Sequence, residues 1–330
     1  MSDRLQQMER WLNSLGYHHY TLTSASEDAS FRSYQRLQQG ANSWVVMDAP
    51  PDKEPCDRFI EIAQKLRQTG LSAPEIINQN LELGFLLLTD LGATPYLSVL
   101  NTDSKEALYA DALSALLQMQ VNVTIHDLDE YNPALLNQEM DLFHDWFLAE
   151  LLGIRLNESQ QVKWLSIKKS LIQNALEQPQ LFVHRDYHSR NLMKIDNGNP
   201  GVIDFQDAVF GPITYDLVSL LRDCYIDWPI DEVESLALDY YRAAKAAALV
   251  DVEPQQFLRW FNLMGIQRHL KAVGIFSRLK IRDGKSDYLN DIPRTLNYLS
   301  QVSELEPGMM ELSGLIVELN LAERIRVMIE

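Results

Sequence analysis

A polar stretch between apolar runs contains residue types that recur in catalytic sites. His184, Asp186 and Asn191 follow the apolar residues 181–183, and Asp204 ends the next apolar run. Phosphoryl transfer needs one carboxylate that orients the attacking hydroxyl and accepts its proton. It also needs an amide and a second carboxylate to hold Mg²⁺, which prefers hard oxygen ligands. The spacing therefore predicts Asp186 as the base, and Asn191 and Asp204 as magnesium ligands.

Turn capping is the alternative role for these side chains. Asp and Asn often hydrogen-bond to nearby backbone in turns, so Asp186 or Asn191 alone would fit a cap. The apolar residues on either side predict strands, and polar groups on a loop between strands favour function. The whole pattern, His-x-Asp-x₄-Asn followed by Ile-Asp, indicates phosphoryl transfer more specifically than either residue does.

Asp216 lies after Gly211-Pro212, a pair that is predicted to open a helix. A carboxylate in the first turn of that helix would suit its dipole. The alternative is that Asp216 accepts hydrogen bonds from the loop around Asp186 and fixes its shape. His188 is likewise either a substrate contact or a residue that stabilises this loop.

The elements that must position these residues predict an α+β protein of two lobes. Strand-like patterns cover about 20–23, 31–37, 43–47, 75–77 and 84–92. Helical patterns cover 4–15, 56–69, 103–121, 137–152, 158–177, 213–225, 232–249, 254–279 and 289–300. Strands first and helices later predict a site in the crevice between the lobes. We expect a small β-rich lobe with its connector at 1–92 and a larger helical lobe at 93–330.

Charge and hydropathy restrict the partners of this 330-residue chain. Its net charge is −17, whereas nucleic acids and anionic membranes require a basic face, so neither is an expected partner. No run of about 18 apolar residues could span a bilayer. The residues after Met1 lack the apolar core of a signal peptide. We expect a cytoplasmic protein that supplies positive charge only locally.

These motifs resemble those of the aminoglycoside phosphotransferase and choline kinase family, which has a protein-kinase-like fold. The similar segments are His184-x-Asp186-x₄-Asn191, Ile203-Asp204 and Gly211-Pro212-x₃-Asp216, within a resemblance over about residues 20–300. The resemblance implies an ATP-dependent kinase that uses Mg²⁺ and acts on an alcohol group, with His184 and Asp216 supporting the loop. The residues whose backbone would bind adenine are Leu88, Thr89, Asp90 and Leu91.

Several phrases resemble a bacterial branch of this family more narrowly, among them residues 28–32 and 267–271. That branch phosphorylates the anomeric hydroxyl of N-acetylmuramate and N-acetylglucosamine to the 1-phosphate in peptidoglycan recycling. The resemblance thus implies a small amino sugar as substrate. The alternatives are a kinase of another small alcohol, such as an aminoglycoside, choline or homoserine, and a nucleotide-binding regulator without turnover.

The contacts to phosphate and sugar are predicted from residue chemistry. The family usually has a phosphate-binding lysine on the third strand, where this chain has only Val45, Val46, Met47 and Asp48. We expect the small loop that contains Ser30, and above all Arg32, to contact the phosphates instead. The lactyl carboxylate of N-acetylmuramate requires a cation. Arg268 and Lys271 lie three residues apart and share a helix face, so they are either sugar contacts or a solvated basic edge. His188 and Asp223 are the other candidate sugar contacts.

Overall fold

The computed structural model describes residues 3–26 and 31–329 and confirms the predicted α+β class. The chain packs as two compact units, Met1–Ala115 with Arg190–Asp207, and Leu116–Ser189 with Ala208–Glu330. These units are defined by packing, so the functional boundary expected at residue 92 stays a prediction. In the part of the chain that is described, no helix is both long and apolar enough to cross a membrane.

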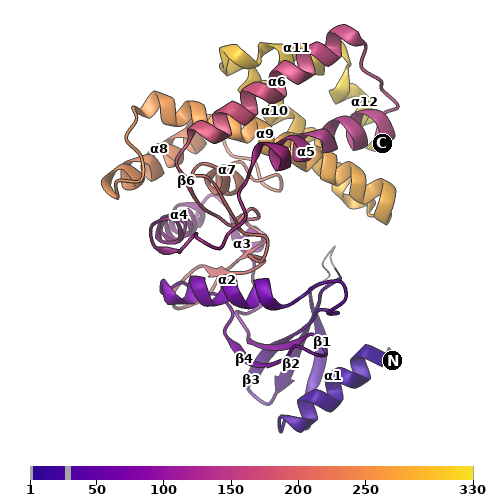
Figure 1. The fold of residues 1–330 in the computed structure, drawn as a ribbon, viewed down its shortest axis with the longest axis vertical. Helices are drawn as coiled ribbons and strands as arrows, with labels where there is room; N and C mark the ends of the chain where they lie inside the picture. The colour runs from indigo at the N-terminus through magenta and orange to yellow at the C-terminus, as the bar shows by residue number, and fades with distance from the viewer. Residues whose placement is uncertain (1–2, 27–30, 330) are drawn as a thin grey trace. The chain divides into compact units, whose positions relative to one another are not determined.

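The first unit is built on a five-stranded antiparallel sheet in the order β1-β2-β3-β5-β4. Helix α1 (Asp3–Ser14) lies beside this sheet (Figure 1). Its apolar side chains Met8, Trp11 and Leu12 form a buried cluster with residues of β2, β3 and β5. Helix α2 (Asp57–Gln68) follows β3 in the chain and buries Phe59 on its apolar side. The strands are β1 (Thr21–Ser26), β2 (Ser33–Gln39), β3 (Asn42–Asp48), β4 (Ile76–Asn80) and β5 (Phe85–Thr89).

A short hairpin completes the first unit. Strands β7 (Leu192–Met193) and β8 (Gly201–Val202) pair antiparallel, and Ser72 pairs in parallel with Gly201. A Cβ at Gly201 would lie 3.1 Å from Cδ1 of Leu91 and 3.3 Å from the Cβ of Met193, so a larger residue would require these side chains to shift. Helix α3 (Tyr96–Val99) belongs to the first unit, and helix α4 (Lys105–Asn122) begins in the first unit and ends in the second.

The second unit is mostly helical. Its helices are α5 (Pro133–Leu142), the π-helix η1 (Phe143–Leu151), α6 (Glu158–Glu177), α7 (Tyr215–Leu221), α8 (Ile230–Ala246), α9 (Pro254–Asp283), α10 (Ile292–Leu305), α11 (Met310–Glu318) and α12 (Leu321–Ile329). The short 3₁₀ segments are η2 (Ser286–Asp291) and η3 (Pro307–Met309). Strands β6 (Gln180–Val183) and β9 (Val209–Pro212) form an antiparallel pair beside them.

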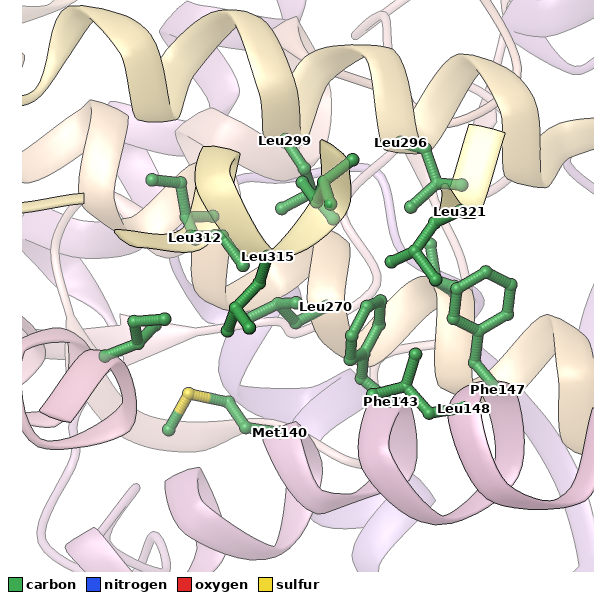
Figure 2. Packing of buried hydrophobic residues seen from close by; sticks show 14 of the residues in the cluster. Met140, Phe143, Phe147, Leu148, Leu270, Leu296, Leu299, Leu312, Leu315 and Leu321 are labelled. Atoms are coloured by element: carbon green, nitrogen blue, oxygen red, sulfur yellow. The ribbon is translucent and has the colours of Figure 1, made fainter. Parts of the chain in front are cut away.

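The core of the second unit joins segments that are distant in the sequence. Figure 2 shows Phe143 and Phe147 of η1 packed with leucines from α9, α10, α11 and α12. Full burial of such a side chain contributes roughly 1.5–3 kcal/mol to stability. Helix α9 approaches the end of α5 so closely that a Cβ on Gly274 would lie 2.3 Å from the carbonyl carbon of Leu142. This packing fixes α9, which carries Arg268 and Lys271.

Some sequence predictions for the second unit were wrong. Gly211 and Pro212 do not open a helix but lie in β9, paired with Leu181 and Gln180 of β6, and the helix begins at Tyr215. The Gly211 backbone passes so close to Tyr131 that a Cβ would lie 3.0 Å from the Cβ of that tyrosine. The helix expected over 137–152 is α5 followed by η1, and α11 and α12 were not predicted.

Candidate active site

The hairpin of the first unit brings the two predicted metal ligands together. Asn191 directly precedes β7, and Asp204 follows β8 by two residues. Because the two strands run antiparallel, Nδ2 of Asn191 lies 3.1 Å from Oδ2 of Asp204. The backbone of Ile203 also donates to the carbonyl of Asn191 at 3.1 Å. Asp204 adopts a left-handed backbone with φ of 64°, which non-glycine residues rarely do.

This amide–carboxylate pair has the chemistry that Mg²⁺ requires. Nε2 of the buried Gln206 donates to Oδ1 of Asp204 at 2.8 Å and fixes the direction of the carboxylate. Mg²⁺ usually takes one or two carboxylates and leaves its other positions to phosphate and water. No cluster of three or more His, Cys, Asp or Glu side chains suited to a metal occurs among the described residues. A magnesium site on Asn191 and Asp204 fits the residues present.

The loop that contains Asp186 belongs to the second unit, and Asp216 holds its backbone. Asp216 is fully buried and accepts the N–H of His184 at 2.6 Å and that of Arg185 at 3.0 Å. Burial raises the pKa of Asp216 to about 7, although these two N–H groups act in the opposite direction. Nδ1 of His184 in turn accepts the backbone N–H of Asp186 at 3.3 Å.

Asp223 holds the other end of the same loop. Its Oδ2 accepts the N–H of Ser189 at 2.9 Å and the hydroxyl of that serine. Its Oδ1 accepts the N–H of Tyr225 at 3.1 Å. The Tyr225 ring lies edge-on to His188, with ring centroids 5.5 Å apart. Asp223 and His188 are therefore part of the support of the loop, and a contact of either with a sugar stays a prediction.

Asp186 lies among positive charges. Burial alone would raise its pKa, but nearby groups outweigh burial and hold the pKa below its ordinary value of 3.8. The groups responsible are, in order of effect, Lys271, His188, Arg268 and Arg185. The Asp186 carboxyl is therefore ionised near neutral pH. This local positive charge contrasts with the net charge of −17 on the whole chain.

A buried glutamate that the sequence analysis missed ties two of these cations together. Oε1 of Glu139 on α5 lies 2.5 Å from Nη2 of Arg185 and 3.0 Å from Nζ of Lys271. Lys271 also donates to the Tyr215 hydroxyl at 2.9 Å. The positive charges of Lys271 and Arg185 overcome the effect of burial and lower the pKa of Glu139, so this carboxylate is charged.

Arg268 differs from Lys271 in how its donors are used. Its side chain is buried, and Nη1 lies 4.0 Å from the sulfur of Cys224. Its Nε has no hydrogen-bond partner among the described residues. Burying an arginine without full pairing is costly, so such an arginine is a candidate for binding an anionic ligand. The alternative of a solvated basic edge is wrong, because Arg268 and Lys271 are both buried.

The connector after β5 is fixed by an ion pair. Nε of Arg36 lies 2.7 Å from Oδ2 of Asp90, and Nη2 donates to the carbonyl of Gly92 at 2.8 Å. Leu88 lies in β5 between Val45 of β3 and Ile76 of β4. Thr89 donates its backbone N–H to Glu75 at 3.0 Å. The adenine contacts predicted for Leu88, Thr89, Asp90 and Leu91 stay predictions.

The predicted phosphate contacts lie before β2. Ser30 falls outside the described residues. Arg32 precedes the strand rather than lying in it, and its Nη2 forms an ion pair with Oε2 of Glu54 at 2.6 Å. Glu61 pairs with Arg58 and Lys65 of its own helix at 3.1 and 3.2 Å. Arg32 therefore has Glu54 as its ion-pair partner, whereas Glu61 of helix α2 has Arg58 and Lys65.

Comparisons with known proteins agree with these motifs. A profile described as "Phosphotransferase enzyme family" matches residues 21–254. An N-acetylmuramate/N-acetylglucosamine kinase of Pseudomonas putida is 45% identical over 92% of this chain and 90% of that protein. A protein of the same name from Neisseria meningitidis is 41% identical over 94% of this chain and 95% of its own length.

Solved structures share the fold at low sequence identity. Choline kinase LicA from Streptococcus pneumoniae has a TM-score of 0.64 at 14% identity, covering 91% of this chain and all of that one. The ADP-bound aminoglycoside phosphotransferase APH(2'')-Ib has a TM-score of 0.59 at 16% identity, covering 90% and 98%. These similarities confirm the expected two-lobed, protein-kinase-like fold.

Proposed function

We propose that this chain, which belongs to the phosphotransferase enzyme family, is an ATP-dependent sugar kinase. Its substrates are N-acetylmuramate and N-acetylglucosamine, and its product is the sugar 1-phosphate, which serves peptidoglycan recycling. The main support is that relatives named for this activity are 41–45% identical over more than nine-tenths of this chain. We place the reaction in the cytoplasm, where ATP is supplied.

Asp186 acts as the base in this proposal. It accepts the proton of the anomeric hydroxyl while that oxygen bonds to the γ-phosphorus and the bond from the γ-phosphorus to ADP breaks. An anomeric hydroxyl is more acidic than an ordinary alcohol, so a carboxylate with a lowered pKa suffices. The main role of Asp186 is to orient the oxygen in line with the phosphorus.

Asn191 and Asp204 would hold Mg²⁺, which neutralises charge on the nucleotide phosphates. Support comes from the 3.1 Å contact between the two side chains and from the Gln206 amide that orients Asp204. Adenine would bind to the backbone of residues 88–91, where the ion pair of Arg36 with Asp90 limits movement. Ser30 and Arg32 would contact the phosphates in place of the missing strand lysine.

The sugar would be bound by residues of the second unit, principally by Arg268. A buried guanidinium with an unused donor suits the lactyl carboxylate of N-acetylmuramate. His188, Asp223 and Lys271 are the further predicted contacts. Because Lys271 already forms an ion pair with Glu139, it has fewer hydrogen-bond donors left for the sugar than Arg268 has.

The test is ADP release with Mg·ATP over a panel of acceptors, followed by NMR identification of the phosphorylated hydroxyl. We expect turnover with both amino sugars and phosphate on the anomeric oxygen. Asp186→Asn should keep ADP binding and lose turnover by about 10²–10⁴-fold. Preference for choline, homoserine or an aminoglycoside would refute the proposal that the substrate is an amino sugar. A lack of turnover with every acceptor would favour the non-catalytic regulator.

A further inference from the structure

The residue before Asp186 has an unusual backbone. Arg185 adopts φ of 77°, in the left-handed region that side chains other than glycine rarely occupy. Such a conformation persists only where surrounding contacts hold it. Its backbone N–H is held by Asp216 at 3.0 Å, and its guanidinium is held by Glu139 at 2.5 Å. This strained backbone sets the direction in which the Asp186 side chain projects from the loop.

The Glu139 carboxylate is itself fixed from several elements of the second unit. Lys271 on α9 reaches Oε1 at 3.0 Å, and Gln267 of the same helix reaches Oε2 at 3.3 Å. The hydroxyl of Tyr131 donates to Oε2 as well. Tyr131 is anchored by its backbone N–H, which donates to the carbonyl of Phe210 in β9 at 2.8 Å. A carboxylate with this many donors is a rigid point of attachment for Arg185.

We propose that Glu139 is a positioning residue for phosphoryl transfer, acting through Arg185 on the direction of the Asp186 carboxylate. The inference rests on the proposed function, in which Asp186 orients the acceptor hydroxyl. Glu139 holds the Arg185 side chain, the side chain stabilises the left-handed backbone, and that backbone aims the next residue. A small misdirection of a reacting group can cost about 100-fold in rate. Glu139 lies 46 residues before Arg185 in the sequence.

Two substitutions separate positioning from a merely structural ion pair. Glu139→Gln removes the charge that binds Arg185. Arg185→Ala removes the side chain that holds the left-handed backbone, and alanine, unlike glycine, does not adopt positive φ readily. If Glu139 acts through Arg185, both variants should lower kcat by about 30–100-fold and change the ATP KM by less than about threefold. The double variant should be no slower than the slower single variant.

The matched control is Glu177→Gln. Glu177 on α6 is another carboxylate that binds α9, through Nε1 of Trp260 at 2.7 Å, but it has no contact with the loop among the interactions described here. This variant should lose stability and keep kcat. Arg185→Lys, which preserves the positive charge, should recover part of the rate that Arg185→Ala loses.

The outcome is decided by kcat measured at saturating substrate on variants whose folding is checked by circular dichroism. Wild-type kcat in Arg185→Ala would overturn the inference, as would rate losses that multiply in the double variant. If Glu139→Gln does not fold, Arg185→Ala and Arg185→Lys still decide. A wild-type protein that does not phosphorylate amino sugars would instead refute the proposed function.

Discussion

Ser189 donates both its backbone N–H, at 2.9 Å, and its hydroxyl to a single carboxylate oxygen of Asp223. The serine lies three residues after Asp186, and Arg190, the next residue, begins the segment that leads to Asn191. Asp223 is therefore attached to the point where the loop leaves the second unit. Asp223, predicted from its sequence position to contact the sugar, thus also supports the loop.

Loss of the Asp223 carboxylate should destabilise the loop more than loss of the serine hydroxyl does. Asp223→Ala leaves the N–H groups of Ser189 and Tyr225 without their acceptor, at a cost of about 2–4 kcal/mol. Ser189→Ala removes one bond and should cost about 1 kcal/mol. Urea denaturation measures both. A normal KM for the sugar in a stable Asp223→Ala variant would exclude a sugar contact.

The ionisation of Asp216 should make stability depend on pH. The pKa of Asp216 is raised from 3.8 to about 7 by burial, so between these values the folded chain keeps a proton that the unfolded chain releases. The stabilisation that comes from keeping this proton is fully present below pH 3.8 and is lost as the pH rises towards 7. The loss amounts to at most about 4 kcal/mol of the free energy of unfolding.

Denaturation of the wild type at pH 5 and pH 8 should show this loss. Asp216→Asn cannot ionise, so its stability should change less between the two pH values, although it also weakens one hydrogen bond to His184 or Arg185. Equal pH dependence in the two proteins would contradict the raised pKa.

Removal of the metal should abolish turnover, and Mg²⁺ should restore it. Asp204→Asn should raise the half-saturating Mg²⁺ concentration by more than about 10-fold, and Gln206→Leu, which removes the supporting amide, by about 10-fold. Initial rates across a Mg²⁺ titration measure both. Asp207→Asn, at an exposed neighbouring acid, is the control and should behave as wild type. An unchanged titration in Asp204→Asn would remove this residue from the metal site.

Arg268→Met should separate the two amino sugars. The charge-assisted contact with a lactyl carboxylate is worth about 1.5–3 kcal/mol, so kcat/KM for N-acetylmuramate should fall about 10–150-fold. N-acetylglucosamine lacks this carboxylate and should change less than about threefold. Lys280→Met, on the same helix but bound to Ser286, is the control. Equal losses on both sugars would show that Arg268 does not distinguish them.

Arg32→Ala should raise the KM for ATP by about 10–100-fold if this arginine replaces the missing strand lysine. Glu54→Gln releases the arginine from its ion pair and should not raise that KM. Kinetics at varied ATP and saturating sugar compare the two variants. An ATP dependence equal to that of the wild type in Arg32→Ala would exclude the phosphate contact.

The sequence predicted the elements whose residues lie close together along the chain. Asn191 and Asp204 are separated by a hairpin of two-residue strands, so their contact follows from local spacing. The five strands of the first unit were each near their expected position because their patterns of apolar residues are clear. The support of the loop by Asp216 was one of two open alternatives.

The contacts that the sequence did not predict depend on tertiary packing. Glu139 lies in a helix of ordinary composition, and nothing in its neighbours indicates that it binds Arg185 and Lys271. Gly211 and Pro212 have the local signature of a helix start, but pairing with β6 overrides it. The left-handed backbone at Arg185 gives no signal, because arginine is not a residue that usually marks such a position.

The cluster drawn in Figure 2 also bears on the order in which the protein becomes competent during synthesis. It joins Met140 and Phe143 to Leu315 and Leu321, which are translated about 175 residues later, as their sequence numbers show. While the nascent chain still lacks α11 and α12, the apolar side chains of α6 and α10 that pack against them have no cover. We therefore expect strands β1 to β5 to fold on the ribosome well before the packing of the second unit is complete.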